Sequence, residues 1–429
     1  MKCKDEFLKE HRLRASDIDL ENLIGVFTEE MTKGLEGKES SLRMIPTYIE
    51  AENEFLTGVP VIAIDAGGTN FRTSLITFRD DGKLEIGGIS NFRMPGLDGE
   101  ISKEDFFQTI AGYIKPMVGS ADRIGFCFSY PTEIYPERDG RLLQFCKEVQ
   151  APGVIGQLIG KNLIEALGTP DKTIVLLNDT VATLLAGKSA SFNRTYDSFI
   201  GFILGTGTNT CYIEQNRNIL KNTMLKKNGS QIINIESGSF GKAPRTDIDI
   251  LFDTTTGNPG SYTFEKMFSG GYFGGLCLAT IKAAAGEGMF SPFTAYNLQN
   301  INELSTEEAG CLLSNTGPDE NYLSGLFSRL SREEKEICRL IIDNLIDRAA
   351  RLVAANIAAV ILKTGRGKSA SRPILITIEG TTFYKLHNLK FRFETYLKEF
   401  FSGEQQRFYD FTGCENSSLI GAALAALII

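Results

Sequence analysis

The first position whose residue type and setting suggest chemistry is Asp179. It stands between the apolar run 174–178, which predicts a strand, and the segment 180–187, which predicts a helix. A carboxylate at a helix N-terminus is favoured in its ionised form and can accept a proton from a substrate hydroxyl. The same position also suits an aspartate that only caps the helix. The local sequence supports the catalytic and the capping interpretations equally.

The segment Asp65-Ala-Gly-Gly-Thr-Asn70 is a second candidate functional site. The apolar run 59–65 predicts a strand, and Gly67 and Gly68 allow backbone N–H groups to converge on an anion such as phosphate. Asp65 can hold a water of a Mg²⁺ ion that bridges phosphates, because Mg²⁺ prefers oxygen ligands and keeps several waters. Taken alone, the segment fits an ordinary hairpin turn better.

Asn209, Glu236 and Glu265 form a third group of polar residues, which follow or lie within glycine-containing segments. Carboxylates and amides exchange hydrogen bonds with vicinal hydroxyl groups, so a set of such residues suits a sugar. Each glutamate, considered singly, is more typical of a solvated surface. Only a fold that brings the three together would give them a common function.

Composition excludes several classes of function. The chain has 429 residues, which predicts two or three domains, and its net charge of −8 provides no general basic field for a nucleic acid or an anionic membrane. Only two histidines are present, which argues against a histidine triad or a multi-histidine metal site. The eight cysteines form no CxxC pair and the charged N-terminus lacks the apolar core of a secretory signal, so we expect a cytoplasmic protein.

The elements expected to position these residues alternate between strands and helices, which indicates the α/β class. Predicted strands cover 59–65, 71–78, 123–129, 174–178, 197–204, 209–214 and 374–380, and a further strand is expected within 84–93. Predicted helices cover 17–36, 103–118, 153–168 and 180–187, with mainly helical patterns over 260–286 and 302–363. The apolar run 419–429 is too short to span a membrane and is expected to be a buried helix or strand.

Two glycine turns resemble one another. Residues 64–70 read Ile-Asp-Ala-Gly-Gly-Thr-Asn and residues 203–209 read Ile-Leu-Gly-Thr-Gly-Thr-Asn, each between two predicted strands. Either two unrelated hairpins share common turn residues, or two homologous half-domains face one anion across a cleft. Only the first turn carries a carboxylate, Asp65, so two homologous half-domains would now have different functions.

Six motifs occur together in a characteristic order. They are Ile64-Asp-Ala-Gly-Gly-Thr-Asn-Phe-Arg72, Phe128-Ser-Tyr-Pro131, Leu177-Asn-Asp-Thr-Val-Ala-Thr183, Gly205-Thr-Gly-Thr-Asn-Thr-Cys-Tyr-Ile-Glu214, Asn234-Ile-Glu-Ser-Gly-Ser-Phe-Gly241 and Asn258-Pro-Gly260. This series resembles the hexokinase family, of the eukaryotic hexokinase and glucokinase type. Segments that begin at Glu29 and Met44 extend the resemblance, which covers about residues 20–429.

The resemblance implies an α/β, actin-like ATPase fold of the ribonuclease-H-like type, with two lobes around a cleft. The small lobe would comprise 58–178 and 416–429, and the large lobe 1–57 and 179–415. The protein would be an enzyme that uses ATP and Mg²⁺ to phosphorylate a hexose, with glucose the first candidate, at the 6-hydroxyl. The expected partner is the sugar, without nucleic acid or membrane, and the sequence leaves the oligomeric state open.

Individual roles follow from the motifs that the resemblance matches. Asp179 would be the general base, with Lys147 as a second catalytic residue. The sugar contacts would be Ser129, Cys146, Lys147, Asn178, Asp179, Asn209, Glu236 and Glu265. The ATP side would comprise Asp65, Gly67, Gly68, Thr69, Asn70, Arg72, Thr206, Gly380 and Ser418, with Asp65 holding Mg²⁺ through water.

Several positions depart from the family pattern. Phe145-Cys-Lys-Glu-Val149 stands where the family has Trp-Thr-Lys-Gly-Phe, which exchanges a hydroxyl for the weaker hydrogen-bonding thiol of Cys146. Ser237 stands where the family has Trp, and the segments 378–384 and 417–419 on the adenosine side are altered. A kinase for a related sugar and a non-catalytic sugar-binding regulator of the same fold are therefore the alternatives.

Overall fold

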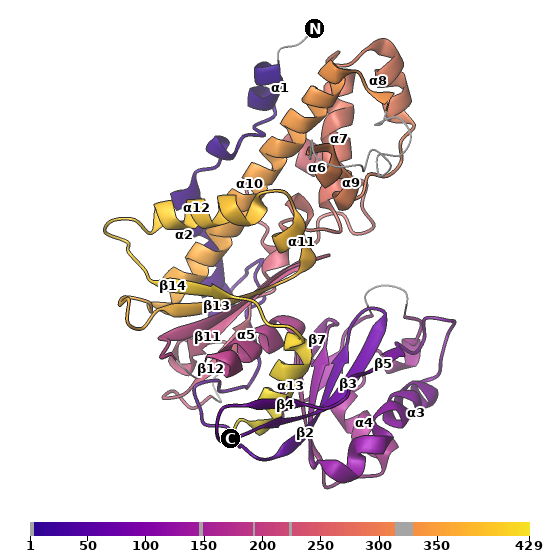
Figure 1. The fold of residues 1–429 in the computed structure, drawn as a ribbon, viewed down its shortest axis with the longest axis vertical. Helices are drawn as coiled ribbons and strands as arrows, with labels where there is room; N and C mark the ends of the chain where they lie inside the picture. Colours follow the sequence, from indigo (N-terminus) through magenta and orange to yellow (C-terminus); the bar gives the residue numbers. More distant parts are fainter. Residues whose placement is uncertain (1–3, 146–148, 192–193, 223–224, 314–328) are drawn as a thin grey trace.

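Two separate sheets organise the chain (Figure 1). The computed structural model describes residues 4–145, 149–191, 194–222, 225–313 and 329–429. The first sheet has the order β4-β3-β2-β6-β9, and β5 also pairs with β3. Its strands are β2 Pro60–Ala66, β3 Asn70–Phe78, β4 Leu84–Ile86, β5 Ser90–Arg93, β6 Arg123–Phe128 and β9 Thr173–Leu177. Because β2, β6 and β9 are parallel, their carboxyl ends meet at one edge.

The second sheet repeats the arrangement of the first. Its order is β1-β12-β11-β10-β13-β14. Its strands are β1 Ile45–Pro46, β10 Ser198–Leu204, β11 Thr208–Gln215, β12 Ser230–Asn234, β13 Ile374–Glu379 and β14 Tyr409–Thr412. In both sheets an antiparallel hairpin, β2–β3 or β10–β11, is followed on its other side by two parallel strands. The two glycine turns therefore occupy equivalent positions, which favours homologous half-domains over unrelated hairpins.

Helices pack on both faces of the first sheet. Along β2, Ile62 and Ile64 share a buried core with α3 Lys103–Ile114 and α4 Ile159–Leu167. The intervening residues Val61 and Ala63 point to the opposite face. There they share a core with α5 Asp179–Ala190 and α13 Ser417–Leu427. A strand that is buried on both faces reads as a continuous apolar run, as the sequence does here.

Helices α5 and α13 join the two halves, and glycine permits their close approach. A Cβ atom at Gly421 of α13 would lie 2.0 Å from the carbonyl oxygen of Ala182 in α5. A Cβ atom at Gly125 of β6 would lie 1.9 Å from the carbonyl oxygen of Ala422 in α13. Both distances are far below van der Waals contact, so any side chain here would separate α13 from its neighbours. The C-terminal run is thus a buried helix, one of the two predicted forms.

The remaining helices lie mostly around the second sheet (Figure 1). They are α1 Lys4–Glu10, α2 Leu20–Glu36, α6 Asp247–Thr254, α7 Phe273–Gly286, α8 Pro292–Gln299, α9 Thr306–Leu313, α10 Arg332–Thr364, α11 Thr381–Lys385 and α12 Leu389–Phe400. A small hairpin, β7 Thr132–Ile134 with β8 Gly140–Leu142, follows β6. Among the described residues, no helix combines the length and the apolar character that crossing a membrane requires.

Three predicted elements were wrong in detail. The strand expected within 84–93 is two short strands, because Gly87 and Gly88 interrupt it. The helix expected over 153–168 begins only at Ile159, after a 3₁₀ turn that ends before Gly156, whose φ is 80°. The helical pattern expected from residue 260 becomes an α-helix only at Phe273.

Candidate active site

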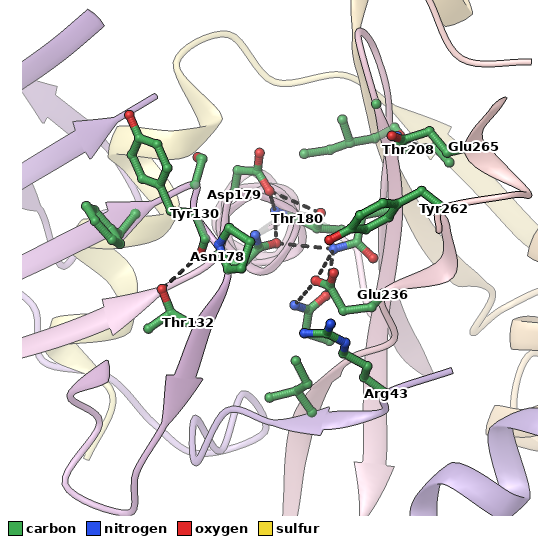
Figure 2. A pocket seen from close by; sticks show the side chains of 18 of the residues that line it. Arg43, Tyr130, Thr132, Asn178, Asp179, Thr180, Thr208, Glu236, Tyr262 and Glu265 are labelled. Atoms are coloured by element: carbon green, nitrogen blue, oxygen red, sulfur yellow. Dashed lines mark hydrogen bonds between the residues drawn. The ribbon is translucent and has the colours of Figure 1, made fainter. Parts of the chain in front are cut away.

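A cavity of about 860 Å³ opens between the two sheets, and most of the expected sugar contacts line it (Figure 2). Ser129, Asn178 and Asp179 come from the edge where the parallel strands of the first sheet end. Asn209, Glu236 and Glu265 come from the half built on the second sheet. Six of the eight expected sugar contacts are therefore gathered around one space. The other two, Cys146 and Lys147, lie outside the described residues.

Asp179 is the first residue of α5, and the cap of this helix is its neighbour. The Asn178 side chain accepts a hydrogen bond of 2.9 Å from the Thr180 N–H, as an N-cap residue does. Asp179 Oδ1 accepts from the same N–H at 2.7 Å. Asn178 thus occupies the N-cap position, and Asp179 is the first residue inside the helix and lines the cavity.

The surroundings of Asp179 raise the pKa of its carboxyl above the usual range. Burial raises the pKa of Asp179, against the hydrogen bond from the Thr180 N–H, which lowers it. The negative charge of Asp65 raises the pKa of Asp179 further, while the nearby Ser129 hydroxyl lowers it. A carboxyl whose pKa is above its usual range is a stronger base than a free aspartate, which suits proton abstraction.

Asn209 holds the sugar-facing side of the cavity together. Its Oδ1 accepts hydrogen bonds from the backbone N–H groups of Thr210 and Ser237, at 2.7 and 3.3 Å. These bonds fix which way the amide faces. Its Nδ2 then donates to Asn234 Oδ1 at 2.7 Å and to Glu236 Oε1 at 3.3 Å. Asn209 therefore fixes the position of a carboxylate that can accept hydrogen bonds from substrate hydroxyls.

Glu236 and Glu265 are two carboxyl groups on one wall of the cavity. Burial raises the pKa of Glu236, although the hydrogen bond from Asn234, at 2.8 Å, and the positive charge of Arg43 lower it. Burial raises the pKa of Glu265 to about 7, against the 2.8 Å hydrogen bond that Oε2 accepts from the Thr208 N–H. Glu236 has a φ of 61°, a conformation that costs free energy for any residue but glycine and is typical of functional sites.

Comparisons with known proteins agree with this arrangement. Two family models described as hexokinase match residues 5–189 and 199–428. The chain belongs to the hexokinase family. Hexokinase-3 of Oryza sativa subsp. japonica is 28% identical over 95% of this chain and 87% of its own length. Hexokinase-1 of Schizosaccharomyces pombe is 28% identical over 94% of this chain and 86% of its own length.

The fold is the actin-like ATPase fold of hexokinases. A solved hexokinase from Schistosoma mansoni, complexed with glucose, has a TM-score of 0.79 and 23% identity, covering 99% of this chain and 100% of that one. Family and fold together make this protein a sugar kinase. The expectations of a hexokinase and of two α/β lobes around a cleft are thus confirmed.

Of the expected ATP-side residues, Thr206 lines the cavity of this hexokinase. Asp65 lies in β2, Gly67, Gly68 and Thr69 form the turn after it, Asn70 and Arg72 lie in β3, Gly380 follows β13 and Ser418 lies in α13. Thr69 and Asn70 line a separate, smaller cavity. Arg72 bridges these elements, since it pairs with Asp65 at 2.6 Å and donates to Asn416 Oδ1 at 3.3 Å. Burial raises the pKa of Asp65, although Arg72 and Ser418 lower it.

The acidic groups at this point fit a magnesium ion that keeps most of its waters. Burial raises the pKa of Glu379 at the end of β13, and the negative charges of Asp179 and Asp65 raise it further. The carboxyl oxygens of these residues are donors of the type that Mg²⁺ prefers. Within the described part of the chain, no group of three acidic, histidine or cysteine residues is arranged to hold a metal by itself. Phosphate oxygens and water would therefore complete the coordination.

Several cavity residues of this hexokinase were missed by sequence reasoning. Arg43, Tyr130, Thr132, Asn234 and Tyr262 line the cavity, and Figure 2 shows Arg43 and Tyr262 beside Glu236. Asn234 lay in a motif already singled out, so its hydrogen bond to Glu236 could have been expected. Arg43 and Tyr262 lie outside the motifs, and no local pattern identifies them.

Proposed function

We propose that the protein transfers the γ-phosphoryl group of ATP to the 6-hydroxyl of a hexose, with glucose as the first candidate and Asp179 as the general base. The observation that carries this proposal is one cavity that combines Asp179 with the hydroxyl-binding set Asn209, Glu236 and Glu265. Such a set suits a polyhydroxylated substrate, and Asp179 supplies a base on the opposite side.

Asp179 accepts the proton of the 6-hydroxyl as the hydroxyl oxygen bonds to the γ-phosphorus. The bond between that phosphorus and the β–γ bridging oxygen breaks, and ADP leaves with the electron pair. Phosphoryl transfer passes through a loose transition state, so the hydroxyl loses its proton late and a carboxylate is basic enough. Asn178 and Ser129 orient the hydroxyl, and Asn209, Glu236 and Glu265 hold the other hydroxyl groups. Lys147 is proposed as a second catalytic residue and Cys146 as a further sugar contact, on the family resemblance alone.

The glycine turn 67–70 and Thr206 are proposed to hold the phosphates, and Gly380 and Ser418 the adenosine. When bound, Mg²⁺ neutralises phosphate charge and orients the γ-phosphoryl group. Asp65 would hold this ion through water, and Arg72 fixes the Asp65 carboxylate in place. We further propose that 58–178 with 416–429 move as one lobe against 1–57 with 179–415, and that the protein works in the cytoplasm.

Two other functions compete with this proposal. A kinase for a related sugar would share every catalytic residue and differ in the residues around the hexose, such as Cys146. A non-catalytic sugar-binding regulator would bind a hexose and release no ADP. The presence of Asp179 and of the first glycine turn favours an enzyme over a regulator.

A coupled assay of ADP release distinguishes these functions. The enzyme is supplied with ATP or GTP and, in turn, with glucose, mannose, fructose, galactose and N-acetylglucosamine. We expect the highest kcat/KM with glucose and ATP. A preference for another sugar would indicate the related kinase. Glucose binding by calorimetry without ADP release from any sugar would indicate the regulator.

A further inference from the structure

The loop between α6 and Glu265 supplies three residues of the cavity wall. Asn258, Tyr262 and Glu265 all line the cavity, yet the ten residues 255–264 contain no helix or strand. Gly260 has a φ of 80° and Tyr262 a φ of 52°, so the chain turns sharply twice. The loop backbone makes isolated turn hydrogen bonds, such as that from the Ser261 N–H to the Asn258 carbonyl oxygen at 3.2 Å, and no continuous ladder. Side-chain contacts therefore help to fix its shape.

A buried ion pair holds the two ends of this loop. Asp253 lies in the last turn of α6 and Lys266 directly follows Glu265. Lys266 Nζ lies 2.5 Å from Asp253 Oδ1 and donates to the Asn258 carbonyl oxygen at 2.7 Å. Asp253 Oδ2 accepts from the Gly260 N–H at 2.9 Å. The two charged side chains thus fix both ends of the loop and two points within it.

The location of this pair argues for a role beyond stability. The Lys266 and Asp253 side chains are 3% and 9% exposed. Taking two charges out of water costs free energy that an apolar pair would not, so a buried pair is a poor means of adding stability. It does impose one geometry, because the desolvated charges must meet. Here that geometry sets the backbone next to Glu265, and the positive charge of Lys266 lowers the pKa of Glu265.

We propose that Asp253 and Lys266 are positioning residues for sugar recognition, which hold the loop 255–264 and Glu265 against the hexose. This inference rests on the proposed function, because it takes the cavity to be the hexose site. Neither residue is a catalytic residue, because neither lines the cavity. Outside the loop, Asp253 faces Arg245 at 3.5 Å and Lys266 lies over the Tyr272 ring. Loss of the pair should therefore weaken hexose binding and leave the ATP side unaffected.

The test compares Lys266→Met and Asp253→Asn with the wild type. We expect Lys266→Met to raise the Kd for glucose in calorimetry, and the glucose KM, about tenfold, with the ATP KM and kcat within twofold. Asp253→Asn keeps the side-chain shape and an oxygen acceptor for Lys266 and the Gly260 N–H, so it should raise the glucose Kd by a smaller factor; thermal unfolding of each variant checks that it is folded.

The control is another buried pair on the same helix. Arg348 lies 2.5 Å from Asp249 of α6, and these side chains are 1% and 3% exposed, away from the loop. Arg348→Lys should lower Tm and leave the glucose Kd unchanged. A glucose Kd that is unchanged in both loop variants would overturn the proposal, as would a wild type that binds no glucose. A wild type that binds glucose without turnover would contradict the proposed function alone, because the Kd comparison still tests the loop.

Discussion

At the residue scale, Asp179 differs from an ordinary helix-start aspartate in its surroundings. Asn178 and Asp179 both accept the Thr180 N–H, but Asn178 occupies the N-cap position, and the Asp179 carboxyl is buried at the cavity, which raises its pKa. A charge that is held in a desolvated site costs free energy, which a structural role would not require. The local sequence supported the catalytic and the capping roles equally, and the geometry favours the catalytic role.

Asp179→Asn should lower kcat about 10²- to 10⁴-fold, the usual cost of losing a general base, while glucose binding survives. Asparagine keeps the shape and the hydrogen bond to the hydroxyl but cannot take its proton. The matched control is Asp105→Asn, in the first turn of α3 and exposed, which should retain full turnover. If the kcat of Asp179→Asn is within threefold of the wild-type value, the role of Asp179 is structural.

The raised pKa of Glu265 predicts that sugar binding depends on pH. Its pKa of about 7 means that the carboxyl of the free enzyme is protonated below that pH and ionised above it. The ionised form can accept hydrogen bonds from substrate hydroxyls with both carboxyl oxygens, so glucose should bind more tightly as the pH rises through about 7. Glucose binding is measured by calorimetry in the Asp179→Asn variant, in which the Asp179 carboxyl can no longer titrate. Adding Glu265→Gln should flatten the profile, and an unaltered profile would exclude Glu265 as its source.

At the element scale, the sequence predicted the strands that carry the site better than the connections between them. β2, β3, β6, β9, β10, β11 and β13 lie close to their predicted ranges, because most are buried apolar runs and β3 and β11 each follow a glycine turn. β12 and β14 were not predicted, since Ser-Gln-Ile-Ile-Asn and Tyr-Asp-Phe-Thr are short, mix polar with apolar residues and are strands through their pairing with β11 and β13. Arg43 and Tyr262 were missed for the same reason, because their contacts with the cavity come from tertiary packing.

A histidine near the N-terminus links three elements. His11 Nδ1 lies 2.8 Å from Asp247 Oδ2 of α6, and Nε2 lies 2.7 Å from Glu287 Oε1 after α7. Both ring nitrogens face carboxylates, which the protonated imidazole satisfies as a double donor. Partial burial lowers the pKa of His11, but the bonds to Glu287 and Asp247 outweigh it and raise the pKa above 6.5.

This contact should make stability depend on pH. A raised histidine pKa contributes stability that is fully present below pH 6.5 and is lost as the pH rises through the folded-state pKa. Thermal unfolding between pH 6 and 8.5 should therefore show a smaller fall in Tm for His11→Gln than for the wild type. His387→Gln, at the second and exposed histidine, is the control and should follow the wild type. Identical slopes for all three proteins would rule out the His11 contact as a contributor.

At the scale of the whole molecule, the family resemblance predicted which distant residues share one site, and local sequence patterns did not. No single motif predicts that Asp179 and Glu265 line one cavity, because 85 residues lie between them in the chain and they belong to different elements, α5 and the 3₁₀ turn Glu265–Met267. The repeated glycine turn was the local clue to the duplicated sheets. The proposed lobe boundaries and the roles of Cys146 and Lys147 stay predictions.

The division of the site between two halves predicts closure. Ser129 comes from the first sheet's half, and Asn209 and Glu236 come from the second. A sugar that contacts both halves stabilises the closed form by its higher affinity for that form. Small-angle scattering at saturating glucose should show a smaller radius of gyration than the free protein. The Glu236→Gln/Glu265→Gln double variant should show no change, and an unchanged wild type would count against a site shared by both halves.

The most direct test of the central claim is the position of the phosphate on the product. The enzyme is given ATP, Mg²⁺ and uniformly ¹³C-labelled glucose, and the product is examined by ¹³C NMR for splitting by phosphorus. We predict splitting at carbon 6 and its neighbour carbon 5, and no product from Asp179→Asn over the same time. Phosphorus coupling at carbon 1, or an Asp179→Asn variant that forms product as fast as the wild type, would contradict the account.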